Sequence, residues 1–202
     1  LVGSSVIVSE TVRGARAVFV NKEGKRFISE LTTRDVTSAA VSKQTGGVAY
    51  EIFDQKVRNK VKQTGATFEL GLAKEGNTIH ELAAAAGIDL DNLEKTMTDY
   101  NRYAENGNDP EFHRPDAFPQ VDKPKYYAIE ITPAIHYYMG GLTIDGKTRG
   151  INTKGQPIKG LVAAGEVTGG VHGKNRLGGN SISETITFGR IAGTQAVKAV
   201  KQ

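Results

Sequence analysis

Short apolar runs, separated by polar and glycine-containing turns, recur along the whole chain. Runs of β-branched and other apolar residues are typical of strands. They predict strands at residues 2–9, 17–20, 48–53, 126–131, 140–144 and 161–164, with a strand resuming at 26–28 after the NKEG turn at 21–24. Because helix-like segments lie among them, the pattern predicts an α+β, or mixed α/β, fold.

Apolar positions three and four residues apart predict helices in other segments. The predicted helices cover residues 35–43, 55–62, 79–86, 89–104 and 186–200. Thr78 and Glu81 have the spacing of a capping box, and Gly87 is a stop signal after that helix. Tyr100 and Tyr103 share an apolar helix face, so we interpret them as core residues rather than cofactor contacts.

The composition changes between residues 106 and 125, where Asn, Gly and Asp stand beside four prolines. This mixture is typical of an irregular connection. The strand-like run at 126–131 follows it, and we place a domain boundary near residues 132–133. The sequence therefore predicts two domains, at residues 1–132 and 133–202.

Residues 163–184, AAGEVTGGVHGKNRLGGNSISE, contain six glycines between a short apolar run and a helix-like run. A strand, a glycine loop and a helix in this order bring the amides of a helix N-terminus toward an anionic or electron-rich ligand. The alternative interpretation is a mobile surface loop without a ligand.

Composition and charge exclude several classes of function. The net charge is +4 over 202 residues, without a block of Lys or Arg, so nucleic-acid binding is not expected. The chain has no cysteine, which excludes disulfides, thiol nucleophiles and covalent haem attachment within it. Its four histidines show no paired spacing, so no metal site is predicted. No run approaches the ~20 apolar residues of a membrane span, and we do not recognise a signal peptide.

Several polar residues interrupt apolar or glycine-rich surroundings. Glu10 and Arg13 are three residues apart, either as a facing pair or as an exposed helix pair. Arg34 is either a functional residue or a surface arginine at the start of a helix. His136 in PAIHYYMGG is either a ligand-binding or a core histidine. Arg176 lies within the glycine loop, where a carboxylate or phosphate can approach a guanidinium closely.

Four motifs occur in a fixed order: SETVRG at 9–14, ELTTRD at 30–35, HYYMGGL at 136–142 and the glycine segment at 163–184. Together they resemble the flavoprotein of fumarate reductases of the soluble flavocytochrome c type, from about residue 6 to the C-terminus. The resemblance is interrupted mainly at 55–125. The wider superfamily includes succinate dehydrogenase flavoproteins and reductases of other 2-enoates.

The resemblance implies a Rossmann-like FAD-binding domain that is interrupted by a mixed α/β capping domain. Residues 1–132 would be the capping domain, and 133–202 the returning C-terminal part of the FAD-binding domain. The family's N-terminal FAD-binding half, with its GxGxxG, has no counterpart here, so we expect neither tight FAD binding nor turnover by this chain alone. The electron donor, a haem or FMN group, and the compartment are left open.

The resemblance also assigns roles to residues at matching positions. Arg34 would be the proton donor, and Glu10 and Arg13 the relay that reprotonates it, with Glu10 also binding the substrate. The carboxylates of a dicarboxylate substrate would be bound by Ser9, His136, Arg176 and the backbone N–H of Gly179. The FAD would be contacted by Tyr137, Glu166, Ser181 and Ile182. Ser9 replaces a common threonine, and Tyr137 replaces a histidine of the soluble enzymes.

The function implied is the reduction of fumarate to succinate, by hydride from the flavin N5 and a proton from Arg34. One alternative is reduction of another 2-enoate, such as urocanate, acrylate or cinnamate. A second alternative is a non-catalytic capping-domain module.

Overall fold

The chain folds into two compact units, Leu1–Pro133 and Ala134–Gln202. The computed structural model describes residues 6–114 and 119–200. Helices and antiparallel sheets occur together, which confirms the predicted mixed α/β class. The identities of the units as capping domain and returning FAD-binding segment remain predictions.

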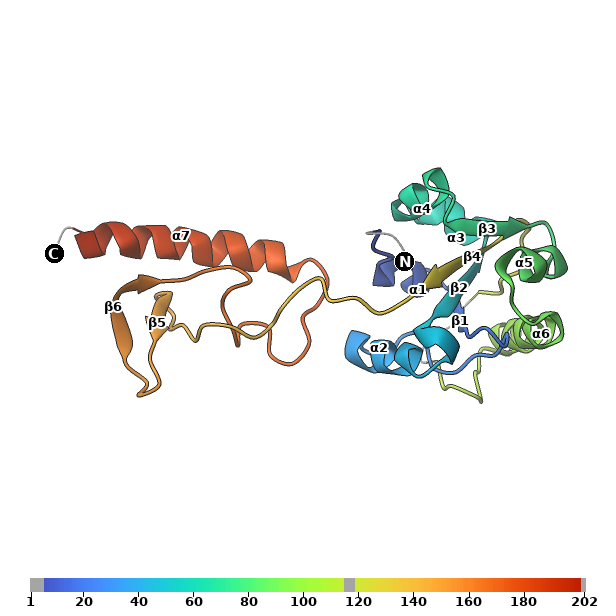
Figure 1. The fold of residues 1–202 in the computed structure, drawn as a ribbon, viewed down its shortest axis with the longest axis horizontal. Coiled ribbons are helices and arrows are strands. Elements are labelled where there is room, and N and C mark those ends of the chain that lie inside the picture. Colours follow the sequence, from blue (N-terminus) through green and yellow to red (C-terminus); the bar gives the residue numbers. More distant parts are fainter. Residues whose placement is uncertain (1–5, 115–118, 201–202) are drawn as a thin grey trace. The chain divides into compact units, whose positions relative to one another are not determined.

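The first unit is organised around a four-stranded antiparallel sheet (Figure 1). Its strands, in spatial order, are β1 (Val18–Val20), β2 (Ala49–Asp54), β4 (Tyr126–Ile131) and β3 (Ala73–Gly76). Every residue of the central strand β2 is buried, as expected for an apolar run with a neighbour on each side. The strands predicted at 17–20, 48–53 and 126–131 are confirmed. The sequence AKEG of β3 lacks β-branched residues, so the apolar pattern missed it.

Helices cover both faces of this sheet. On one face, α5 (Ile79–Ala86) and α6 (Leu90–Asn106) contribute Leu82, Leu93 and other side chains to a buried cluster. On the other face, α1 (Glu10–Gly14) and α3 (Gln55–Lys60) pack in a second cluster. Side chains of β2 alternate between the two faces with the two-residue period of a strand.

Side-chain caps fix the helix boundaries that the sequence predicted. Thr78 Oγ1 accepts from the Glu81 N–H at 3.1 Å, and Gly87 ends α5 with φ of 66°. Asp89 Oδ1 accepts from the Asn92 N–H at 3.0 Å at the start of α6. Each cap satisfies an amide that the first turn leaves without an intrahelical partner. The predicted helices at 35–43, 55–62, 79–86 and 89–104 are confirmed, the first of them as α2 (Arg34–Ser42).

Other local predictions were wrong. Residues 2–5 of the predicted strand 2–9 lie outside the described residues, and residues 6–9 are not a strand. Ser9 instead caps α1, accepting from the Thr11 N–H at 3.3 Å. Residues 26–28 form only a single bridge, between Val20 and Arg26. Helix α4 (Gly65–Glu69) and the short helices η1 (Thr45–Gly47) and η2 (Lys62–Thr64) were not predicted.

The second unit contains a two-stranded sheet, β5 (Arg149–Ile151) and β6 (Pro157–Val162), and the long helix α7 (Asn180–Val200). The predicted strand 140–144 is reduced to isolated bridges at Leu142 and Ile144. The helix begins at Asn180 rather than residue 186. Within the described part of the chain, we find no helix with both the length and the apolar character needed to cross a bilayer.

Candidate active site

Helices α1 and α2 bring two of the predicted proton-transfer residues into direct contact. Arg34 is the first residue of α2, and its Nη2 lies 3.2 Å from Glu10 Oε1 at the start of α1. The side chains are 29% and 42% exposed, so both groups are half in water. The pair is therefore held in place and still accessible to a proton or a small acid.

Arg13 lies on the same short helix but is buried, with 9% of its surface exposed. Its Nη1 donates to the carbonyl oxygens of Glu30 and Thr32, both at 2.7 Å, and to Thr37 Oγ1 at 3.2 Å. Burial lowers the pKa of Arg13, Glu51 and Glu10 raise it, and Arg34 lowers it further. Net lowering makes the guanidinium a better proton donor than an exposed arginine.

In the second unit, two glycines let the HYYMGGL segment lie directly against the glycine loop. Leu142 forms a parallel bridge with Thr168, and a Cβ added at Gly169 would lie 2.6 Å from the backbone N of Gly141. A Cβ added at Gly141 would overlap the carbonyl oxygen of Val167. Only glycines allow this close approach of two backbones. This close approach brings side chains of the two segments together.

We expect Gly141→Ala to lower the free energy of unfolding by about 1–3 kcal/mol, because the new methyl group forces the two backbone segments apart. Urea unfolding of the chain, followed by circular dichroism, measures this change. Gly140→Ala is the matched control, since a Cβ there meets nothing within 4 Å. Equal stability of the two variants would show that the contact between residues 141 and 167 is dispensable.

Arg176 is buried, with 7% of its surface exposed, and its guanidinium carbon lies 4.2 Å from the centroid of the Tyr137 ring. Its backbone N–H donates to Met139 Sδ at 3.1 Å. Tyr137 Oη in turn lies 3.3 Å from His172 Nε2. A cation stacked on an aromatic ring is stabilised when both are desolvated. The glycine loop and the HYYMGGL segment thus share a cluster of polar side chains.

The remaining predicted residues of the second unit are mostly exposed. His136 is exposed and is not a core histidine. Glu166 is also exposed, and its Oε1 accepts from the Tyr138 N–H at 2.8 Å. Gly179 has a φ of 84° immediately before α7, and its carbonyl accepts from the Ile182 N–H at 3.1 Å. Ser181 lies beside Ile182 in the first turn of the helix.

Three buried glutamates, Glu30, Glu51 and Glu184, were missed by sequence reasoning. Glu184 Oε1 accepts from the Gly165 N–H at 3.1 Å and so ties α7 to the glycine loop. Glu51 lies on the central strand β2 with 3% of its surface exposed. Its position inside the apolar run AYEIF was the available signal, because a carboxyl in a fully buried strand is unusual.

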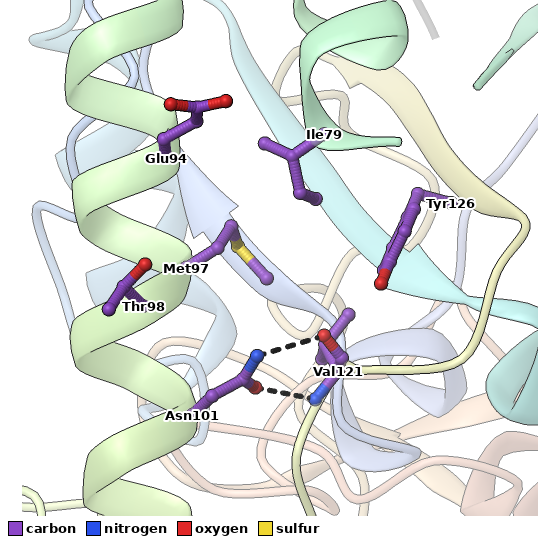
Figure 2. Close-up of a pocket in the computed structure, with 7 residues that line it drawn as sticks. All are labelled: Ile79, Glu94, Met97, Thr98, Asn101, Val121 and Tyr126. Carbon is purple, nitrogen blue, oxygen red and sulfur yellow. Dashed lines mark hydrogen bonds between the residues drawn. The ribbon is translucent and has the colours of Figure 1, made fainter. Parts of the chain in front are cut away.

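A small pocket of about 280 Å³ lies elsewhere in the first unit, between α5, α6 and the segment before β4 (Figure 2). The amide of Asn101 closes its base by bonding both the N–H and the carbonyl of Val121, at 2.7 and 3.0 Å. None of the predicted site residues lines it. Among the described residues we find no cluster of three metal-ligating side chains.

Comparison with known proteins gives consistent matches. A protein-family model described as "FAD binding domain" matches residues 1–182. A fumarate reductase (cytochrome) from Shewanella frigidimarina is 48% identical over 201 residues, covering 100% of this chain and 35% of that protein. An NADH:acrylate oxidoreductase from Vibrio harveyi is 44% identical over 184 residues, covering 89% of this chain and 18% of that protein.

A solved structure, the open conformation of a flavocytochrome c3 fumarate reductase, matches with a TM-score of 0.76 and 48% identity. The match covers 96% of this chain and 34% of that chain. This chain therefore spans about a third of the length of these two fumarate reductases.

Proposed function

Because the chain belongs to the FAD binding domain family, whose model matches residues 1–182, we propose that it is part of an FAD-dependent reductase of unsaturated acids. The proposed reaction is the reduction of fumarate to succinate. The observation that carries the proposal is the contact between Arg34 and Glu10, beside the buried Arg13. These residues supply a proton donor and a route to reprotonate it.

Arg34 is assigned as the general acid. An unperturbed guanidinium has a pKa above ~12, so it gives up a proton only to a strongly basic carbon that develops as hydride arrives. The neutral guanidine left on Arg34 is reprotonated through Glu10, whose carboxylate accepts a proton from Arg13 and passes it to Arg34. Arg13 then takes a proton from water. The 3.2 Å contact between Arg34 and Glu10 supports the transfer from Glu10 to Arg34.

The carboxylates of the substrate are assigned to Ser9, His136, Arg176 and the N–H of Gly179. Fixed positive charge at the carboxylates draws electron density away from the alkene, which favours hydride addition. His136 is exposed, whereas Arg176 is buried against Tyr137. The burial of Arg176 supports a role in which its charge acts in a site with little water.

The residues assigned to the cofactor fit an FAD. Glu166 offers an exposed carboxylate to sugar or ribityl hydroxyls, and Tyr137 offers a ring. Ser181 and Ile182 lie at the N-terminus of α7, a helix long enough to favour negative charge there. When bound, FAD supplies the hydride. A haem elsewhere in the parent protein is our proposed electron donor, by analogy with the relative named a cytochrome, and FMN is the alternative.

Substrate competition in the full-length protein tests the proposal. With a reduced viologen as donor, we expect kcat/KM for fumarate to exceed that for urocanate, acrylate and cinnamate by at least tenfold. Turnover of none of them would refute the proposal. A preference for acrylate would favour the second candidate, an acrylate reductase, which the 44% identical relative supports.

A further inference from the structure

Four charged side chains form a buried network inside the first unit. Arg26 contacts Glu30 at 2.9 Å and Asp109 at 2.8 Å, while Arg114 contacts Glu30 at 3.0 Å. Their side chains are 0–2% exposed. Two positive and two negative charges cancel, which offsets much of the cost of burying them.

The members of this network come from distant parts of the chain. Arg26 and Glu30 follow β1, whereas Asp109 and Arg114 follow the end of α6. Burial alone would lower the pKa of Arg26, but the carboxylates of Glu30 and Asp109 raise it above its usual value. Arg26 therefore stays charged at all ordinary pH.

The network contacts Arg13 at its main chain and at its side chain. Arg114 Nη2 donates to the backbone carbonyl of Arg13 at 3.1 Å, while its Nη1 donates to Glu30 Oε2. The backbone carbonyl of the same Glu30 accepts from Arg13 Nη1 at 2.7 Å. The main chain and the side chain of Arg13 are thus both tied to the Arg114–Glu30 pair.

We propose that Arg114 is a positioning residue for proton transfer, acting through Arg13. This inference rests on the proposed function, in which Arg13 reprotonates Glu10. Helix α1 has only five residues, so it does not by itself fix the direction of a long side chain. Proton transfer requires donor and acceptor within hydrogen-bond reach, and a loosely held arginine spends little time there. Arg114 limits that freedom by bonding the main chain of Arg13 directly and by holding Glu30, whose carbonyl accepts from the Arg13 guanidinium.

The test compares Arg114→Lys and Arg114→Met with a matched control, Asp109→Asn. Lysine keeps the charge beside Glu30 but has a single nitrogen for two acceptors. Asp109→Asn perturbs the same buried network through Arg26, and within the described part of the chain Asp109 makes no hydrogen bond to Arg13. It also keeps the oxygen that accepts from the N–H groups of residues 111 and 112.

The first measurement is hydrogen exchange at the Arg13 guanidinium, by ¹⁵N NMR on the 202-residue chain, with signals assigned by their loss in Arg13→Lys. We expect exchange at least tenfold faster in Arg114→Lys and within twofold of wild type in Asp109→Asn. If Arg114→Met does not fold, Arg114→Lys alone decides. Unchanged exchange in Arg114→Lys, or equal acceleration in Asp109→Asn, would overturn the positioning role.

The second measurement is kinetic and uses the full-length protein. We expect Arg114→Lys to lower kcat at least tenfold, with KM within twofold and a larger solvent isotope effect, while Asp109→Asn keeps kcat within twofold. If the wild type is active and Arg114→Lys has a normal kcat, the positioning role of Arg114 is refuted and the proposed function is not. Wild type that reduces none of the four acids refutes the proposed function instead, and the exchange measurement still decides the positioning.

Discussion

Replacing Arg34 with alanine in the full-length protein is expected to lower kcat for fumarate reduction by about 100-fold or more, because a positioned general acid contributes ~10²–10⁴ in rate. The alkene carbon that receives the proton is not basic until hydride arrives, so water is a poor substitute for a fixed donor. Arg34→Lys is expected to fall nearly as far, since an ammonium places its proton differently from a planar guanidinium. Stopped-flow reoxidation of the reduced protein by fumarate measures the step directly.

The matched control for this prediction is Arg102→Ala. Arg102 forms a surface ion pair with Asp99 at 2.7 Å, three residues away on α6, and 60% of its side chain is exposed. Exposed pairs of this kind contribute little to stability. We expect kcat in Arg102→Ala to equal that of the wild type. A loss of less than about tenfold in Arg34→Ala, ~1.4 kcal/mol of barrier, would show that another group donates the proton.

The sequence was sufficient for much of the fold because local signals agree with the tertiary structure. Helix α5 was predicted with its observed bounds, since the Thr78 cap, the apolar spacing and Gly87 all indicate the same segment. The strand prediction for residues 6–9 was wrong. The apolar run favours a strand, but the N-cap at its end determines the backbone conformation, and the apolar pattern does not reveal this. In the second unit, the apolar run at 140–144 forms only bridges, because Leu142 pairs with Thr168 of the glycine loop while Ile144 pairs with Gly150 of β5, so no single strand pairs with the whole run.

For the candidate site, the sequence indicated which residues to consider but not the environment of their side chains. The spacing of Glu10 and Arg13 was consistent with either a facing pair or an exposed helix pair, and nothing local indicated that Arg13 is buried and Glu10 half exposed. Arg13 is buried by contacts 17 to 24 residues away, and it is anchored by Arg114, 101 residues away. Such contacts depend on the sheet order, which periodicity does not determine.

Glu51→Gln is expected to stabilise the chain at alkaline pH. Glu51 lies on β2 beside Phe19 of β1 and Ile129 of β4. By strand alternation its side chain shares a face with Phe53, which belongs to the cluster that contains Val12 of α1. Its Oε2 is buried without a hydrogen-bond partner among the described residues. Burial raises the pKa of Glu51 from 4.5 to about 8, although the charge of Arg13 opposes the rise.

The direction of the pH effect follows from proton counting. Between pH 4.5 and 8 the folded chain holds a proton on Glu51 that the unfolded chain has lost. Stability must then fall as pH rises, by about 1.4 kcal/mol per pH unit from this group. The contribution is complete below pH 4.5 and is lost as pH approaches 8, a total on the order of 5 kcal/mol. Glutamine has no proton to lose, so Glu51→Gln removes this slope.

Urea unfolding of wild type and Glu51→Gln at intervals from pH 5 to pH 9 measures the difference. We expect the two free energies of unfolding to be similar near pH 5 and to diverge with rising pH, with Glu51→Gln the more stable. The matched control is Glu75→Gln. Glu75 lies on β3, which pairs with β4, and its side chain is 54% exposed beside Lys125. This variant should keep the wild-type slope. Parallel curves for Glu51→Gln and wild type would mean that Arg13 keeps Glu51 ionised. In that case an ionised Glu51 paired with Arg13, and not a protonated Glu51, would lie next to the relay residues of α1.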